Sequence, residues 1–387
     1  MAATAASPKA GLEGLTAGAT AICRVEQDDL LYRGYSVNDL AENATYEEVA
    51  FLLLVGHKPS GPELAHFKDE LVGERPLPAV VTSYIRSMEA PLKHGSAVPM
   101  DVVRTAVSLL GNLDPESQHE DPDAELRKSK RLLAKIPTII GQMQNVIDGR
   151  DLVAPETGGD HDLSHAGNLL YLITGEKPAP EFARVVDVSL ILYAEHDFNA
   201  STFTSRVIAA TLSDLHGSVT GAIAALKGRL HGGANEAAMD MLKEIRLHVD
   251  GGGTVKEWLG RAFAEKRKLM GFGHRVYKNG DHRAPILHAL GRSIAEARGA
   301  DAVTWFEIGE ETQRIMLEEK SIHPNVDFPC GLTYYTMGIP VPQYTPIFVA
   351  ARTAGWCAHV IEQHANNRLI RPLAEYVGPE TRQWSAD

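Results

Sequence analysis

The chain has 387 residues, of which 44% are hydrophobic, and a formal net charge of −12. This length exceeds one ordinary core, so we expect two domains, or one large helical domain with a lobe. The negative charge argues against nonspecific nucleic-acid binding, and an anionic ligand would need a local basic pocket.

The cysteines indicate a reducing compartment, and the apolar segments indicate a protein without a membrane span. Cys23, Cys330 and Cys357 are far apart and form no CxxC pair, so neither a disulfide framework nor a cysteine-based zinc site is indicated. The first ten residues lack the apolar core of a signal peptide, and no apolar run approaches membrane-spanning length. We therefore expect a cytoplasmic protein with no membrane segment.

The first element expected in chain order is a small β hairpin. Alternating, β-branched pieces lie on either side of Asp28 and Asp29 within residues 18–36. Strands do not alternate with helices further along, so a parallel sheet is not expected. Residues 45–56 begin with a capping box and end at a glycine, and residues 60–73 repeat this helix pattern.

The middle of the chain contains two predicted loops and further predicted helices. The acidic, proline-bearing residues 112–126 and the glycine-rich residues 148–168 are expected to be surface connections. Residues 181–196 have an apolar face that widens to all sides, which predicts a buried helix. The small side chains of residues 200–228 predict two closely packed helices.

Four acid–base candidates stand apart by their surroundings: His196, His231, His274 and Asp327. His231 precedes a predicted helix, whose dipole favours a neutral imidazole, although a linker histidine explains this stretch as well. The glycines beside Phe272 place His274 on a tight loop, which a solvated basic loop would equally explain. Asp327 suits either a carboxylate base or a helix N-cap residue.

Other chemistries find little support in the residue spacing. The two glycines at positions 271 and 273 lack the third glycine of a dinucleotide fingerprint and the GKS or GKT of a Walker A loop. The histidines show no HExxH or i, i+4 pairing, so a metal site is not expected. A GxSxG motif is absent from the sequence, so a serine nucleophile is weakly supported.

Six motifs, taken in order, resemble the citrate synthase family, which includes 2-methylcitrate synthases. They are AEHDFNASTFTSRV, LHGGANEAAM, MGFGHRVYKNGDHR, NVDFPCG, FVAARTAGWCAHVIEQ and RLIRPLAEYVGP. The resemblance runs from about Gly11 to Gly378, nearly the whole chain. It implies a mainly α, two-domain helical fold with a small N-terminal β hairpin. Residues 1–230 and 333–387 would form the large, dimerising domain, and residues 231–332 the small, CoA-binding domain.

The resemblance also implies a reaction and its residues. Asp327 would remove a proton from the methyl group of an acyl thioester, and His231 would donate a hydrogen bond to the enol or enolate oxygen. His274 would polarise and protonate the ketone of oxaloacetate. The carboxylates would be held by His196, Arg283, Arg352 and Arg371, of which Arg371 would come from the second subunit of a homodimer.

Coenzyme A would bind at the loop that the third motif contains. The family segment that meets the adenine corresponds to Leu269, Met270, Gly271, Phe272 and Gly273, and Lys278 corresponds to a basic position near the phosphates. Neither a metal nor a redox cofactor is implied, since the CoA thioester is itself the substrate.

The acyl group is less sharply implied than the family. Citrate synthase, which makes citrate and CoA from acetyl-CoA, oxaloacetate and water at the entry to the tricarboxylic acid cycle, is placed first. Tyr193 is the residue type seen in 2-methylcitrate synthases, which use propionyl-CoA, whereas Val326 resembles citrate synthases. Dual activity, or an inactive family-fold regulatory or scaffold protein, are the alternatives. This sequence also departs from the family at His282, where proline is common, and at Cys330, where serine is frequent.

Overall fold

The computed structural model describes residues 14–157, 163–274 and 276–384. The first ten residues, for which we expect no signal peptide, lie outside this part of the chain. So do the outermost residues of the predicted large domain, 1–13 and 385–387.

A three-stranded antiparallel sheet opens the described chain. Its strands, in the order β1-β2-β3, are β1 (Cys23–Val25), β2 (Leu30–Tyr32) and β3 (Tyr35–Ser36). The turn between β1 and β2 contains Asp29, whose Oδ1 accepts hydrogen bonds from the Leu30 amide at 2.7 Å and the Ser36 hydroxyl at 2.8 Å. The predicted hairpin is therefore confirmed, and a short third strand extends it.

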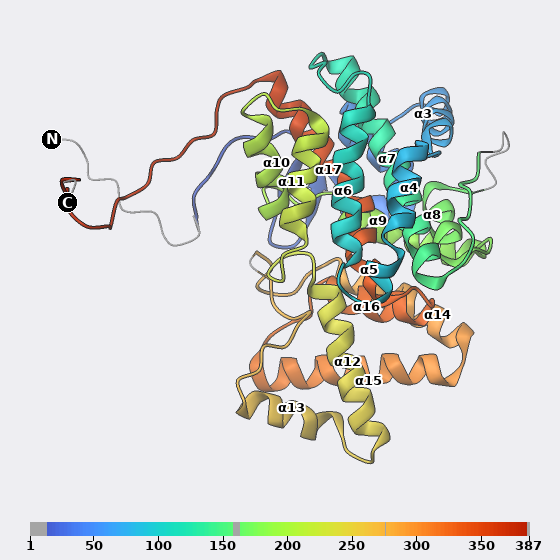
Figure 1. Ribbon diagram of the computed structural model, residues 1–387. Helices are drawn as coiled ribbons and strands as arrows, with labels where there is room; N and C mark the ends of the chain where they lie inside the picture. The colour runs from blue at the N-terminus through green and yellow to red at the C-terminus, as the bar shows by residue number, and fades with distance from the viewer. Residues whose placement is uncertain (1–13, 158–162, 275, 385–387) are drawn as a thin grey trace.

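The rest of the described chain is helical, and the mainly α prediction is confirmed. The helices that precede His231 form the upper body in Figure 1. They are α1 (Val37–Asn43), α2 (Tyr46–Val55), α3 (Gly61–Glu74), α4 (Ala79–Ser87), α5 (Glu89–Lys93), α6 (Pro99–Leu113), α7 (Pro122–Asp148), α8 (His165–Thr174), α9 (Pro180–Tyr193), α10 (Ala200–Ala209) and α11 (Leu215–Leu226).

The remaining helices divide between a lower layer and the core. They are α12 (Ala234–Asp250), α13 (Val255–Ala264), α14 (Ala284–Arg298), α15 (Ala300–Lys320), α16 (Asp327–Thr336), the 3₁₀ turn η2 (Val341–Gln343) and α17 (Tyr344–Ala365). Helices α12 to α15 lie together beneath the upper body in Figure 1, and α16 lies between the two groups. The proposed domain limits at residues 231 and 332 stay a prediction.

Local sequence signals account for several helix ends. Thr45 and Glu48 form the predicted capping box of α2, and Gly56 ends that helix with φ 98°. The loop prediction for residues 112–126 is wrong at both ends, because α6 continues to Leu113 and α7 already begins at Pro122. There the Asp121 carboxylate caps the helix by accepting from the Ala124 amide at 2.9 Å.

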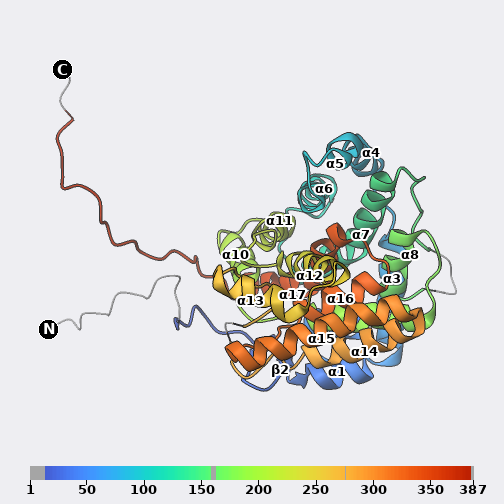
Figure 2. The same cartoon turned by 90° about the horizontal axis from the view of Figure 1, so that it is seen from below.

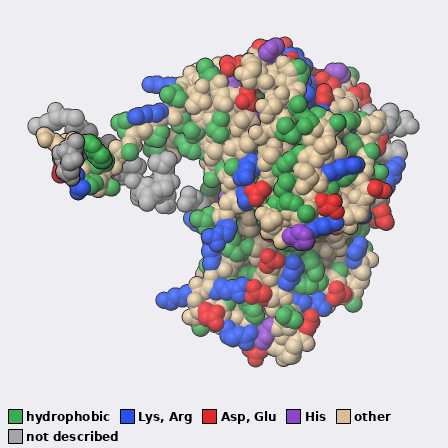
Figure 3. All heavy atoms as spheres, in the orientation of Figure 1, with side chains coloured by type: hydrophobic (Ala, Val, Ile, Leu, Met, Phe, Trp, Pro, Cys, Tyr) green, Lys and Arg blue, Asp and Glu red, His purple; other side chains and the backbone are tan. Residues whose placement is uncertain are grey.

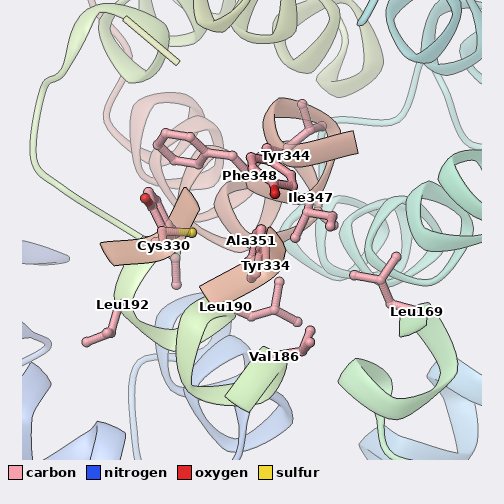
Figure 4. Close-up of a cluster of buried hydrophobic side chains, with 14 of the residues drawn as sticks. Leu169, Val186, Leu190, Leu192, Cys330, Tyr334, Tyr344, Ile347, Phe348 and Ala351 are labelled. Atoms are coloured by element: carbon pink, nitrogen blue, oxygen red, sulfur yellow. The ribbon is translucent and has the colours of Figure 1, made fainter. Parts of the chain in front are cut away.

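Helix α17 forms the centre of the core. It packs against α2, α7, α9, α10 and α11. Figure 4 shows apolar side chains of α8, α9, α16 and α17, among them Leu169, Leu190 and Ile347, converging on one buried cluster. The predicted buried helix of residues 181–196 is α9, and the predicted pair in residues 200–228 is α10 packed on α11.

The outer surface and the C-terminal segment complete the description. Acidic and basic side chains are intermixed over the lower helices on the face that Figure 3 shows. After α17 the described chain leaves the helical body as an exposed, extended segment (Figures 1 and 2). Within the described ranges, every helix is too short or too polar to cross a membrane.

Candidate active site

Six of the seven predicted catalytic and oxaloacetate-binding residues come together at the helix ends that meet beside α17. His196 follows α9, His231 precedes α12, and Asp327 begins α16. The other three are His274 and Arg283, on the loop before α14, and Arg352, in the middle of α17. The seventh, Arg371, lies in the exposed C-terminal segment.

His274 is held as a neutral donor. Its Nδ1 accepts hydrogen bonds from the amides of Val276 at 3.1 Å and Tyr277 at 3.2 Å, so the ring proton is on Nε2. Burial and then the Arg283 guanidinium lower the pKa of His274 to about 4. The ring stacks on Tyr277 with centroids 4.5 Å apart.

His196 lies beside His274, with ring centroids 5.2 Å apart. Its Nε2 is 3.0 Å from the hydroxyl of Tyr277, a residue that sequence reasoning missed. Burial, reinforced by Arg283, lowers the pKa of His196 well below its ordinary value. Two neutral histidines therefore face the same small space.

His231 is a neutral histidine that contacts Ser201. Its Nε2 lies 3.3 Å from the Ser201 amide and 2.8 Å from the Ser201 hydroxyl, which itself donates to Asn199 Oδ1 at 2.7 Å. Burial and then Arg352 lower the pKa of His231 to about 4. The neutrality agrees with the sequence prediction, and burial and the nearby cation contribute to it.

Asp327 is a partly buried carboxyl group at the first residue of α16. The N-cap of this helix is Val326, so the N-cap reading of Asp327 was one residue off. The Tyr193 hydroxyl donates to Asp327 Oδ1 at 2.7 Å. Burial raises the pKa of Asp327 to about 6, although Tyr193 and Arg283 oppose that rise. Such a carboxyl group is a stronger base than an exposed aspartate and is still ionised at neutral pH.

Arg283 is held in place by Asp281, a residue whose role the sequence analysis does not predict. The Arg283 Nε and Nη2 atoms donate to the two Asp281 oxygens, each at 2.9 Å. Asp281 also accepts from the Val326 amide at 3.0 Å, so it joins this loop to the turn before α16. Although burial opposes ionisation, Arg283 holds the pKa of Asp281 well below its ordinary value.

Arg352 is a buried cation with spare hydrogen-bonding capacity. Its Nε donates to the Tyr193 carbonyl at 2.6 Å, and its guanidinium lies 4.8 Å from the centre of the Phe348 ring. Its Nη1 is buried and has no hydrogen-bond partner within the described chain. A buried donor of this kind is costly unless it is paired, and a ligand carboxylate would pair it.

The loop predicted to meet CoA is shaped by two glycines with positive φ, 81° at Gly271 and 76° at Gly273. The Gly273 amide donates to the His323 carbonyl at 2.8 Å, and the Asn325 amide donates to the Gly271 carbonyl at 2.9 Å. A pocket of about 240 Å³ lies between this loop and the segment before α16, and Lys278 lines it. Leu269, Met270 and Phe272 are partly buried against the core.

We expect Gly271→Ala to destabilise the protein by at least about 1 kcal/mol more than Gly273→Ala, measured by urea unfolding. Both changes strain a backbone with positive φ. At Gly271, however, a new Cβ would lie 2.9 Å from Phe328 Cβ, whereas at Gly273 the nearest atom is 3.6 Å away. Equal losses in the two variants would contradict the importance of that close contact.

The two departures from the family pattern lie beside the site. His282 packs edge-on against Tyr277 with ring centroids 4.9 Å apart, and both of its ring nitrogens are buried without a partner in the described chain. Cys330 is fully buried, and burial raises the pKa of its thiol to about 12. In the described residues, no group of three or more His, Cys, Asp or Glu side chains is arranged to hold a metal ion.

Comparison with known proteins gives relatives along the whole chain. The family described as "Citrate synthase, C-terminal domain" matches residues 11–373. The chain is 40% identical over 374 residues to citrate synthase 2 of Bacillus subtilis, covering 97% of each protein. It is 43% identical over 376 residues to 2-methylcitrate synthase of Shewanella oneidensis, covering 97% of this chain and 96% of that protein.

Solved structures of citrate synthases also match the chain along nearly its whole length. Citrate synthase from Pyrobaculum aerophilum matches with a TM-score of 0.87 and 37% identity, covering 97% of this chain and 94% of that one. Citrate synthase from Thermoplasma acidophilum, in ternary complex with carboxymethyl coenzyme A and oxaloacetate, matches with a TM-score of 0.88 and 30% identity, covering 97% of each.

Together, these matches define an acyltransferase of the type that converts its acyl group into an alkyl group on transfer. The chain belongs to the citrate synthase family. Its relatives are named for both citrate and 2-methylcitrate synthesis at about 40% identity, so the family alone does not select the acyl group.

Proposed function

We propose that the protein is a citrate synthase that condenses acetyl-CoA with oxaloacetate and water to give citrate and CoA. The observation that carries this proposal is one partly buried base, Asp327, accompanied by two neutral histidines, His231 and His274, and by two buried arginines. In the cell, the reaction would feed the tricarboxylic acid cycle from the cytoplasm.

Deprotonating the methyl group next to a thioester requires a base and a donor together. Asp327 takes the proton, and the ring N–H of His231 donates to the carbonyl oxygen as negative charge develops there. Removal of one such preorganised donor typically costs about 3–4 kcal/mol of transition-state stabilisation. Because His231 is neutral, it donates without placing a second charge near the enolate.

The second substrate is activated by His274. Its Nε2–H polarises the ketone of oxaloacetate, and this proton passes to the ketone oxygen as the new C–C bond forms. His196, Arg283 and Arg352 hold the carboxylates, and the unpaired Nη1 of Arg352 supports this assignment. Arg371 would complete the set from the second subunit of a homodimer, which suits its exposed position in an extended segment.

Coenzyme A is assigned to the loop from Leu269 to Gly273 and to Lys278. Glycine with positive φ at position 273 keeps this part of the loop free of a side chain, which supports close approach by a nucleotide. We propose that neither a metal nor a redox cofactor takes part, because the base, the donors and the carboxylate-binding cations are all side chains of the protein.

The alternative is a 2-methylcitrate synthase. One observation favours it: Tyr193, the residue type seen in those enzymes, contacts Asp327 directly and so lies where the acyl chain would end. One methylene group supports only about 1–3 kcal/mol of discrimination, or roughly 10–200-fold.

We expect kcat/KM for acetyl-CoA to exceed that for propionyl-CoA, measured by CoA release with oxaloacetate on one preparation. A reversed ratio would assign the protein to 2-methylcitrate synthesis, and comparable values would show dual activity. Absence of CoA release with either thioester and any 2-oxo acid would instead indicate an inactive regulatory or scaffold protein.

A further inference from the structure

The last turn of α9 contacts the base and both buried arginines. The Leu192 carbonyl accepts from Arg283 Nη1 at 3.3 Å, and the Tyr193 carbonyl accepts from Arg352 Nε at 2.6 Å. The Tyr193 side chain donates to Asp327 at 2.7 Å. The last carbonyls of a helix lack intrahelical partners and carry the negative end of its dipole, so cations are favoured there.

We propose that Tyr193 is a positioning residue for the condensation, because its hydroxyl fixes Asp327 through Oδ1 and leaves Oδ2 to accept the substrate proton. This inference rests on the function proposed above. Within the described ranges, no hydrogen-bond partner is found for Oδ2. A carboxylate held by one oxygen keeps the other in a defined direction, which proton transfer from a weak carbon acid requires.

The aromatic ring of Tyr193 is itself held in place. It packs against Phe348 with ring centroids 4.4 Å apart and an interplanar angle of 57°. Phe348 also lies under the guanidinium of Arg352 and 6.5 Å, between ring centroids, from His231. The Tyr193 ring therefore has little freedom to rotate away from Asp327, and its hydroxyl keeps a fixed position relative to that carboxylate.

Tyr334 is a second buried tyrosine near Tyr193, and its hydroxyl contacts Ser189 and Cys330. The Ser189 hydroxyl donates to the Val186 carbonyl at 2.7 Å, so it accepts from the Tyr334 hydroxyl, 2.6 Å away. Tyr193 gives its proton to Asp327, so both phenol oxygens are free to accept. The Cys330 thiol interacts with both phenols and can donate to either. Figure 4 shows Cys330 and Tyr334 in this core.

The other charged or titratable groups that face Asp327 are Asp281 and Arg283 from the loop before α14, Arg352 from α17 and Cys330 from α16 itself. Of these, Cys330 also interacts with the Tyr193 hydroxyl. The pKa of Asp281 lies below that of Asp327, which is about 6, and the pKa values of Arg283 and Cys330 lie above it. The acidic limb of a pH profile near pH 6 therefore reports on Asp327.

The test is Tyr193→Phe, which removes the hydroxyl and keeps both the ring on Phe348 and the main-chain carbonyl on Arg352. The lost hydrogen bond favoured the ionised carboxylate, so its removal raises the pKa of Asp327. The acidic limb of kcat/KM should move up by about one pH unit. At neutral pH or above, kcat should fall by at least about tenfold, while KM for oxaloacetate stays within about twofold.

A matched control is Tyr46→Phe, which removes another fully buried phenol hydroxyl, bonded to the Ala350 and Ala351 carbonyls. It should lower the thermal midpoint without moving the pH limb. If the Tyr193→Phe profile superimposes on that of an active wild type, the positioning role is overturned while the proposed function stands. A wild type inactive with both thioesters overturns the proposed function, and this role with it.

Discussion

Replacing Asp327 by alanine lowers the rate of CoA release by roughly 10²–10⁴-fold, the range expected for loss of a positioned general base. The neighbouring Asp281 cannot take over, because both of its oxygens are already bound by Arg283. Steady-state kinetics with acetyl-CoA and oxaloacetate measure the effect. An Asp327→Ala enzyme with near wild-type kcat would overturn the catalytic assignment.

Two further variants separate chemistry from folding in that experiment. Asp327→Asn keeps an acceptor for the Tyr193 hydroxyl and should be as inactive as the alanine variant. Asp301→Ala removes a carboxylate from the first turn of α15, where its side chain is 78% exposed. This control should retain full activity, and all three variants should keep the helical circular dichroism of the wild type.

Arg283→Met destabilises the protein by about 3–5 kcal/mol in urea unfolding, because it leaves Asp281 buried without its counter-charge. The two side chains are 4% and 0% exposed, so water cannot replace the lost guanidinium. Methionine has a similar length, which limits the loss of packing. The free energy of unfolding from linear extrapolation is the quantity to compare.

A double variant tests the cause of that loss. Asp281→Asn combined with Arg283→Met removes both charges, and the amide oxygen can still accept from the Val326 amide. It should recover at least half of the stability. Arg314→Met, at a side chain that is 55% exposed, should change stability by less than about 0.5 kcal/mol. A loss below 1 kcal/mol in Arg283→Met would contradict the uncompensated-charge explanation.

The parts of the fold that could be read from sequence are those whose signal is complete within a few residues. The capping box at Thr45 forms as its spacing predicts, and Thr254 begins α13 with the same arrangement. The start of α7 was missed although Asp121 and Pro122 carry the same kind of signal, because the acidic composition around them favoured a loop. The family was predicted from the order of six motifs, each of which alone has an ordinary structural explanation.

The contacts that orient the site could not be predicted from sequence. His231 contacts Ser201, and His196 contacts Tyr277, which lies 81 positions further along the chain. Such pairings depend on how separate helices pack, and no local pattern encodes them. Asp281 had a weak signal, an acidic residue two positions before an arginine, but only burial shows that the pair is essential to that loop.

The close approach of Gly271 to Phe328 has a mechanical consequence. The glycine belongs to the loop proposed to bind the nucleotide, and Phe328 follows the proposed base, Asp327, in α16. Under the proposed function, direct packing would therefore couple the contacts at the two ends of the thioester. A fixed separation between these contacts would bring the methyl group of the substrate to the same depth at each turnover.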